Sequence, residues 1–348
     1  MKIISPIDGD MLHARDGIAV EGGLQITVMV SADPDSEIWV RDVRARYVNG
    51  VFLANVVLTG YENVLEVGDE KIVVYWVKEF AGGYRLSIDD NIWFLRDIYY
   101  NAGIYRSIFD NPYLGFLKKV HDTYGTKIHL NLFYQTEGFN LSQLSDEFAD
   151  EWKAQAGWLR LSFHALGEFP DKPYIRAGYE QMKKDCELVM KEIRRFAGPE
   201  IMGPVTTVHW GEATVEGVRA LRDLGYRGLL GYFNVDDELP EVSYYLDVEQ
   251  RRHIKRRFIW KDNTADMVFV RSSIVIDKTP LVGIRPHLDG HNNFFGGFPP
   301  YVDLLVHEQY YYPFYFNYQP DYEGRILTAV QWAVDNGYKP RFLEESIF

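Results

Sequence analysis

The pattern of apolar residues changes near residue 84, and this change constrains the fold more than any other feature of the chain. Before it, short apolar runs alternate with turn residues, which is typical of antiparallel strands. After it, compact apolar runs alternate with helical stretches, the rhythm of buried parallel strands joined by helices. The sequence therefore predicts an α/β protein in which a small all-β sandwich (residues 1–80) precedes a β/α barrel, complete or distorted (residues 84–348).

The individual elements follow from the same patterns. Sandwich strands are predicted over 18–20, 24–30, 38–40, 51–58 and 71–77. Barrel strands are predicted over 127–133, 159–163, 203–208, 228–232 and 304–306, helices over 179–196 and 214–224, and a hairpin insertion within 242–278. The opening Ile4-Ser5-Pro6-Ile7-Asp8-Gly9 resembles the first strand of immunoglobulin-like modules common in extracellular carbohydrate enzymes, which implies an immunoglobulin-like sandwich. Its strands lack a cluster of titratable groups, so we expect a supporting or sugar-binding accessory.

The composition excludes several classes of protein. The 348 residues are 47% hydrophobic and 25% charged, as in ordinary globular chains, and the net charge of −13 argues against binding to nucleic acid. No apolar stretch is long enough to span a membrane, and residues 1–10 lack the pattern of a signal peptide. We therefore expect a cytoplasmic protein, or an extracellular or periplasmic one if a leader has been removed. The lone Cys186 excludes an internal disulfide and a cysteine-rich zinc site.

The pair Asp89-Asp90 is the first candidate for chemistry. It ends the apolar run 84–88 and precedes the helical pattern 91–98, so it belongs to a strand-to-helix loop, where α/β proteins place their chemistry. Adjacent carboxylates repel each other unless a cation, a shared proton or solvent separates their roles. The alternative is that an aspartate caps the helix by accepting hydrogen bonds from its first N–H groups.

Two other strand ends carry histidine. His164 follows the run 159–163 and stands four residues before Glu168, so one helical turn would direct both side chains at a common ion. His307 follows the run 304–306. Because the strand ends of a barrel meet on one face, the side chains of these segments and of Asp89-Asp90 are predicted to lie close together.

These segments give the second part of the chain, roughly residues 84–336, a resemblance to the polysaccharide deacetylase family, the NodB-homology carbohydrate esterases with a distorted β/α barrel. Ser87-Ile88-Asp89-Asp90 fits the family's Asp-Asp motif, and Leu305-Val306-His307 fits its Leu-x-His motif. His164 to Pro170 fits its His-x-x-x-His-and-Pro motif, with Glu168 in place of the second histidine. Thr207 stands four residues before Gly211, where the family's third motif carries an arginine.

The resemblance implies a role for each of these residues. Asp89 would be the general base that activates water, and His307 the acid that protonates the leaving amine. Asp90 and His164 would bind a divalent metal with Glu168 as the third ligand. Zinc is the expected ion, and the anionic Glu168 also admits manganese or iron. His209, which follows the third motif's Thr207, either contributes a polar group to the site in place of the arginine or has no role.

Other segments are weaker candidates. The rings of Trp210, Tyr310 and Tyr311 could bind a sugar, although core packing also explains such tyrosines. His287 and His291 repeat the four-residue spacing, but Gly290 favours a loop there. The basic run 251–257 could hold an anionic sugar or phosphate, or form a solvated strand face.

The sequence thus predicts a metal-dependent hydrolase that removes acyl groups from an N-acylated carbohydrate or a related amide. One alternative is a non-catalytic carbohydrate-binding protein on a degenerate barrel. Another is a glycoside hydrolase or lyase that uses Glu168 or Glu212 with an aspartate, and the metal content separates the two enzymes. The sugar, the acyl group and the oligomeric state do not follow from the sequence.

Overall fold

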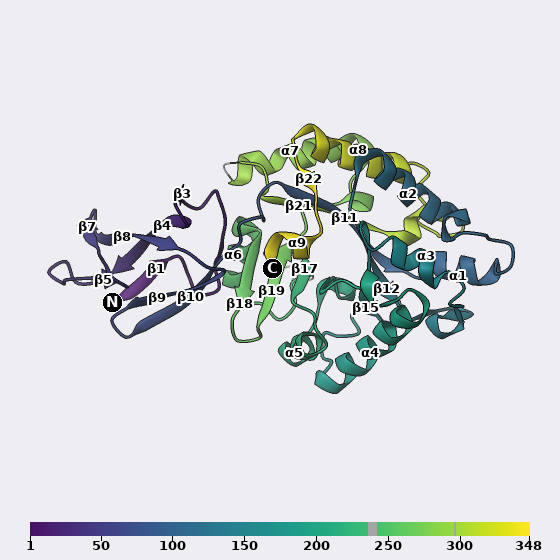
Figure 1. Cartoon of the computed structure of the whole chain (residues 1–348), viewed down its shortest axis with the longest axis horizontal. Coiled ribbons are helices and arrows are strands. Elements are labelled where there is room, and N and C mark those ends of the chain that lie inside the picture. Colours follow the sequence, from purple (N-terminus) through teal and green to yellow (C-terminus); the bar gives the residue numbers. More distant parts are fainter. Residues whose placement is uncertain (236–241, 296) are drawn as a thin grey trace.

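The first part of the chain folds into strands, and Figure 1 shows it at one end of the molecule. The structure is a computed structural model that describes residues 1–235, 242–295 and 297–348. A five-stranded sheet contains β1 (Lys2–Ser5), β3 (Ile18–Val20), β4 (Gly23–Ser31), β7 (Arg46–Val48) and β8 (Val51–Leu58). A second sheet contains β2 (Met11–Leu12), β9 (Glu62–Val67) and β10 (Glu70–Trp76), and β5 (Trp39–Val40) pairs with β6 (Val43–Arg44). The immunoglobulin-like topology and the domain boundary stay predictions.

Strand β4 illustrates why these residues form a sheet. Its apolar side chains Leu24, Ile26, Val28 and Val30 are buried, whereas the residues between them are more exposed. Side chains of a strand alternate between its two faces, so the period-two pattern places one face in a core shared with β8.

Two further sheets form the second part of the chain. The six-stranded sheet has the order β15-β12-β11-β21-β20, with β22 also paired to β11, and all its ladders are parallel. Its strands are β11 (Gly83–Asn91), β12 (Ile128–Phe133), β15 (Leu159–Ala165), β20 (Ile274–Val275), β21 (Tyr301–His307) and β22 (Lys339–Pro340). The four-stranded sheet has the order β16-β17-β19-β18, with β16 (Val205–Thr206), β17 (Gly228–Gly231), β18 (Ile259–Asp262) and β19 (Met267–Arg271). A small hairpin pairs β13 (Gln135–Thr136) with β14 (Phe139–Asn140).

Among the described residues, the predicted barrel is not closed by a continuous backbone ladder. Within the described residues no ladder joins the six-stranded sheet to the four-stranded one. A backbone bridge pairs Leu161 of β15 with Met202, which precedes β16. Side-chain hydrogen bonds from Ser162 to the Val205 carbonyl and from Thr206 to the Phe163 carbonyl join β15 to β16. Strand β16 is two residues long and follows Pro204, which has no backbone N–H to donate to a neighbouring strand. The α/β class is confirmed, whereas closure of the barrel is not.

In Figure 1, helices α2, α7 and α8 lie along the top of the second part of the chain, and α4 and α5 lie along the bottom. The helices are α1 (Trp93–Tyr100), α2 (Pro112–Tyr124), α3 (Ala149–Ala154), α4 (Tyr179–Phe196), α5 (Val215–Asp223), α6 (Val248–Arg257), α7 (Ile284–Phe295), α8 (Tyr322–Asp335) and α9 (Leu343–Ile347). The predicted helices 179–196 and 214–224 are confirmed, and Thr214 caps the second by accepting from the N–H of Gly217.

None of the described helices has the length and apolarity needed to cross a membrane.

The two parts of the chain meet through an apolar cluster and ion pairs. Phe80 is fully buried and stacks on Tyr301 with ring centroids 5.6 Å apart. The basic run 251–257 forms most of helix α6 rather than a strand. Arg257 of this helix forms an ion pair with Asp16 of the first part, with Nη1 2.6 Å from Oδ1. The basic run therefore contributes to contacts between the two parts.

The predicted hairpin insertion is confirmed by the antiparallel pair β18 and β19.

Candidate metal centre

Asp89 and Asp90 lie at the carboxyl end of the central strand β11, in which every residue is buried. The backbone of Asp90 has φ 63°, in the left-handed region that residues other than glycine seldom adopt. Such a conformation costs on the order of 1 kcal/mol or more and is concentrated at functional sites. It turns the Asp90 side chain toward β15 and the loops beyond it.

Neither aspartate caps helix α1, so the capping alternative is wrong. The carboxylate of Glu308, directly after β21, accepts hydrogen bonds from the backbone N–H groups of Ile92 (2.6 Å), Trp93 (2.9 Å) and Phe94 (2.6 Å). These are the groups that the first turn of a helix leaves without an internal partner. Because Glu308 satisfies them, both aspartates stay available to the site.

Asp90, His164 and His209 bring three ligand atoms together. Oδ1 of Asp90 lies 2.9 Å from Nε2 of His164 and 3.0 Å from Nδ1 of His209, and the two nitrogens are 3.2 Å apart. All three residues are buried, and among the described residues they form one group with the spacing of a metal site.

The outer nitrogens of the two histidines fix the direction of their lone pairs. Nδ1 of His164 faces the backbone carbonyl of Thr207, and Nε2 of His209 lies 3.1 Å from the carbonyl of Glu168. A carbonyl oxygen only accepts hydrogen bonds, so each outer nitrogen carries the proton and, in the neutral ring, the inner nitrogen presents a lone pair. Two lone pairs and a carboxylate oxygen then converge on one point, an arrangement that a cation stabilises.

The donor set fits a divalent ion. Ligand atoms about 2.0–2.2 Å from one ion stand about 2.8–3.6 Å apart, the lower end for octahedral and the upper for tetrahedral coordination. The measured separations of 2.9, 3.0 and 3.2 Å lie within this range. Two imidazoles and one carboxylate would hold zinc or another divalent transition metal. Buried Asp90, His164 and His209 can therefore bind a divalent metal.

The charges around Asp90, His164 and His209 also favour a cation at this point. Burial tends to raise the pKa of Asp90. With no cation bound, protonated rings of His164 and His209 donate to Asp90 from their inner nitrogens, and these hydrogen bonds outweigh burial and hold the pKa of Asp90 well below its ordinary value. Burial tends to lower the pKa of His164, but the carboxylates of Asp89 and Asp90 outweigh it and raise the pKa. The carboxylates thus attract positive charge to this point. Gln309 donates to Oδ2 of Asp90 at 2.8 Å, which leaves Oδ1 directed at the histidines.

Glu168 occupies a different place from the one expected. The segment after His164 is not helical, because β15 runs to Ala165 and Glu168 lies in the irregular loop that follows. The helical turn that was expected to direct both side chains at one ion is therefore wrong. The Glu168 carboxyl lines the pocket, and burial, followed by the nearby Asp90 charge, raises its pKa. Its backbone carbonyl positions His209. His209, expected only as a possible polar group, completes the three-residue set, whereas the Glu168 carboxylate stays a predicted ligand.

Asp89 has an amide partner, the side chain of Asn131. Nδ2 of Asn131 donates to Oδ1 of Asp89 at 2.6 Å, and the hydroxyl of Thr206 donates to Oδ1 of Asn131 at 3.0 Å, which fixes the orientation of the amide. Burial raises the pKa of Asp89, and the uncharged amide opposes this less than a cation would. Sequence reasoning missed Asn131, although a polar residue in the apolar run 127–133 was a signal.

His307 lies beside Asp89 and has its own carboxylate. The two residues are register partners on the parallel strands β11 and β21. Nδ1 and the backbone N–H of His307 donate to Oδ1 of the fully buried Asp277, at 2.9 and 3.0 Å. Burial lowers the pKa of His307, but the Asp277 charge outweighs it and raises the pKa to about 10. Nε2 is left to face the pocket. Sequence reasoning missed Asp277, which no motif marked.

These side chains line one cavity of about 400 Å³. Its lining includes Asp89, Asp90, His164, Glu168, His209, Trp210, His307 and Tyr310. Trp210 is 37% exposed, so its ring is accessible to a ligand. Tyr311, the third predicted sugar-binding ring, instead packs against Tyr113 and Tyr322. The strand ends therefore meet on one face as predicted.

His287 and His291 lie away from this cavity. Helix α7 continues through Gly290, so the expected loop is wrong and both histidines share one helix face. Their Nε2 atoms face the carbonyl oxygen of Ser273 at 3.3 and 2.7 Å. Neither histidine lines the cavity.

Comparisons with known proteins give structural likenesses only. No protein-family model and no curated protein matches the sequence. The structure is similar to a CE4 family pseudoenzyme from Bacillus anthracis (TM-score 0.40, 9% identity), covering 77% of this chain and 66% of that one. It is similar to a family 4 acetyl xylan esterase from Clostridium thermocellum in complex with a cobalt ion (TM-score 0.39, 12% identity), covering 75% of this chain and 88% of that one. It is also similar to a 4-alpha-glucanotransferase from Thermococcus litoralis (TM-score 0.48, 11% identity), covering 77% of this chain and 40% of that one. All three TM-scores are below 0.5.

Removal of the Glu308 carboxylate is expected to destabilise the protein. In Glu308→Ala, three N–H groups of helix α1 lose their acceptor in a buried place, so we expect a loss of about 2–4 kcal/mol in the free energy of unfolding. Glu323→Ala, at an exposed glutamate in the first turn of α8, should cost less than about 1 kcal/mol. Urea denaturation measures both values, and equal losses in the two variants would contradict the capping role.

Proposed function

We propose that this chain is a metal-dependent hydrolase that removes acyl groups from an N-acylated carbohydrate or a related amide. The observation that carries the proposal is the convergence of Asp90, His164 and His209 on one point, with Asp89 and His307 beside them. A divalent ion held there would polarise the acyl oxygen and lower the pKa of water, the chemistry needed to hydrolyse an amide.

Asp89 is the proposed general base. It adjoins the ligand Asp90, and Asn131 holds one of its oxygens, so the other can face the cavity. A carboxylate whose pKa is raised accepts a proton more readily than an exposed aspartate, and burial raises the pKa of Asp89. Asn131 and Thr206 therefore act as positioning residues for the proton transfer from water.

His307 is the proposed general acid. Asp277 accepts from its Nδ1–H and stabilises the protonated ring, and Nε2 can donate a proton to the leaving nitrogen. Because Asp89 and His307 come from neighbouring strands at the same register, one substrate in the cavity can contact both. Expulsion of an amine requires such a proton, so an amide substrate needs both groups.

A carbohydrate substrate is supported by the aromatic rings at the cavity. Trp210 and Tyr310 line it, and flat apolar faces beside polar side chains suit the rings and hydroxyls of a sugar. The order of the Asp-Asp, His and Leu-x-His segments resembles that of the carbohydrate deacetylases, which favours an acyl group on nitrogen. The choice of sugar and of acyl group lies outside the proposal.

Metal content and acetate release test the proposal together. Protein purified without chelator should contain about one divalent ion per chain, with zinc, manganese and iron as the candidates. It should release acetate from N-acetylated oligosaccharides, lose this activity on chelation and regain it when metal is restored. Metal-loaded protein that releases no acetate from a broad panel would favour the non-catalytic carbohydrate-binding alternative. Cleavage of the oligosaccharides to shorter reducing sugars, with no metal required, would favour a glycoside hydrolase.

A further inference from the structure

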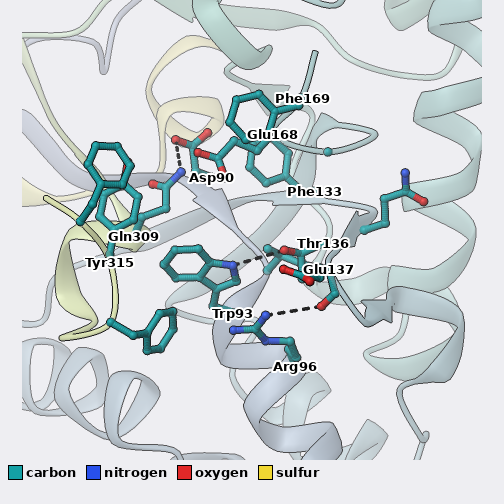
Figure 2. Close-up of a pocket in the computed structure, with 15 residues that line it drawn as sticks. Asp90, Trp93, Arg96, Phe133, Thr136, Glu137, Glu168, Phe169, Gln309 and Tyr315 are labelled. Carbon is teal, nitrogen blue, oxygen red and sulfur yellow. Dashed lines mark hydrogen bonds between the residues drawn. The ribbon is translucent and has the colours of Figure 1, made fainter. Parts of the chain in front are cut away.

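A cavity of about 280 Å³ lies where the sandwich meets helix α6. Figure 1 shows α6 on the side of the second part that faces the sandwich. One wall contains Ser5 of β1 and Thr27 of β4, and the other contains His253, Arg256 and Arg257 of α6. Among the described residues, its lining shares no member with the cavity at the candidate metal centre or with the adjoining groove that Figure 2 shows. A ligand here would contact both parts of the chain and leave the metal centre untouched.

Two carboxylates also line this cavity, and both are already bound within the protein. Oδ2 of Asp10 accepts from a backbone N–H at 2.9 Å, and its Oδ1 forms an ion pair with His253. Oδ2 of Asp16 accepts from another backbone N–H at 2.9 Å, and its Oδ1 lies 2.6 Å from Nη1 of Arg257. All four carboxylate oxygens therefore have donors, and each negative charge lies beside a basic side chain.

The unused hydrogen-bonding capacity of the lining belongs to its donors. Nε and Nη2 of Arg257 are buried and have no acceptor among the described residues. These two nitrogens lie on one edge of the planar guanidinium, which can bind two oxygens of one oxyanion in parallel. Arg256 is exposed, and no ion pair joins it to a carboxylate in the part of the chain that the structure describes. Donors and positive charge together favour a ligand that is a negatively charged acceptor.

The two arginines and the size of the cavity narrow the class of ligand. A phosphate group has three or four free oxygens, so it can accept from both guanidiniums and from the hydroxyl of Ser5 at once, whereas a carboxylate has two. The edge of Arg257 is enclosed in this conformation, and rotation about the last bonds of the side chain would turn it toward the cavity. A volume of about 280 Å³ is near the lower end of ligand pockets, so the ligand is small.

We propose that this cavity binds the phosphate group of a small molecule through Arg256, Arg257 and Ser5, and that the ligand joins the sandwich to helix α6. The basic run 251–257 then has a binding role in addition to its contacts between the two parts. Inorganic phosphate and a phosphorylated sugar present the same group, and their affinities distinguish these two sources. The proposal is independent of the proposed hydrolysis, because the two sites share no described residue.

Isothermal titration calorimetry on the full chain tests the site. The protein is first freed of metal with a chelator and desalted, because phosphate also coordinates metal ions. Inorganic phosphate, glucose 6-phosphate and acetate are then titrated at one ionic strength, since salt screens exposed charges. We expect both phosphates to bind more tightly than acetate. Tighter binding of glucose 6-phosphate would identify an organic phosphate as the ligand, and tighter binding of inorganic phosphate the free ion.

Three variants locate the binding. Arg256→Ala should weaken phosphate binding at least about 10-fold, because it removes charge-assisted hydrogen bonds. Arg257→Lys keeps a positive charge beside Asp16 but removes the two-donor edge, so a loss of about 10-fold is expected here too. Arg252→Ala is the matched control, because this exposed arginine of α6 pairs with Glu249 and lies outside the cavity. It should bind phosphate as the unaltered protein does.

Thermal melting of the same samples adds a second measurement. Saturating phosphate should raise the melting temperature of the unaltered protein and of Arg252→Ala, because the ligand binds the folded chain, and should raise that of Arg256→Ala less. Failure of both phosphates to bind would overturn the proposal. Equal losses of affinity in Arg252→Ala and Arg256→Ala, or acetate binding as tight as that of phosphate, would overturn it as well. None of these results depends on acetate release, so the hydrolase proposal stands or fails separately.

Discussion

Zinc affinity is expected to fall by more than about 100-fold in His209→Ala, because even partners that only orient a ligand typically contribute 10- to 100-fold. The variant removes one of the three inner ligand atoms and leaves Asp90 and His164 with an incomplete set. Glu168→Gln should lower the affinity by less than about 10-fold, because it keeps the backbone carbonyl that positions His209. Competition with a chromogenic chelator measures both affinities.

This pair of variants decides between the ligand set expected from the sequence and the one that the structure brings together. His121→Ala, at a half-buried histidine of helix α2, serves as the control and should bind zinc as the unaltered protein does. A large loss of affinity in Glu168→Gln with little change in His209→Ala would restore Glu168 as the third ligand. Circular dichroism confirms that each variant is folded.

Acetate release is expected to fall about 10²- to 10⁴-fold in both Asp89→Asn and His307→Ala, the usual effect of losing a general base or acid. Both variants should keep the bound ion, because neither removes Asp90, His164 or His209. Asp89→Asn preserves the size of the side chain and removes its capacity to accept a proton. Initial rates on N-acetylated oligosaccharides, with metal content measured on the same samples, give the result.

Two further variants separate chemistry from structure in this second prediction. Asp122→Asn, at an exposed aspartate of helix α2, should keep full activity. Asp277→Asn keeps the shape of the side chain beside His307 but removes the charge that holds the ring protonated, so its activity should fall mainly at high pH. Unchanged rates in Asp89→Asn and His307→Ala would remove both residues from the proposed chemistry.

Local patterns were sufficient for most of the elements. Helix α4 has the predicted limits of 179–196, and β12 begins one residue after the predicted start of 127 and ends at 133 as predicted. Apolar periodicity and neighbouring turn residues are local properties of the sequence, so they locate such elements. Helix α7 contradicts the loop that Gly290 favoured, since a single glycine costs about 1 kcal/mol in a helix and packing can offset it. Barrel closure depends on pairing between short strands that are distant in sequence, which no local pattern encodes.

The sequence by itself determined that Asp89-Asp90, His164 and His307 stand at the ends of buried strands, because each follows a compact apolar run. The tertiary structure alone decided which side chains complete them. His209 reaches His164 and Asp90 from the loop after β16, Asn131 reaches Asp89 from β12, and Asp277 reaches His307 from the turn after β20. These partners are separated by 30 to 119 positions in the chain. Their meeting depends on the parallel order of the strands, which places the carboxyl ends of distant segments at one edge.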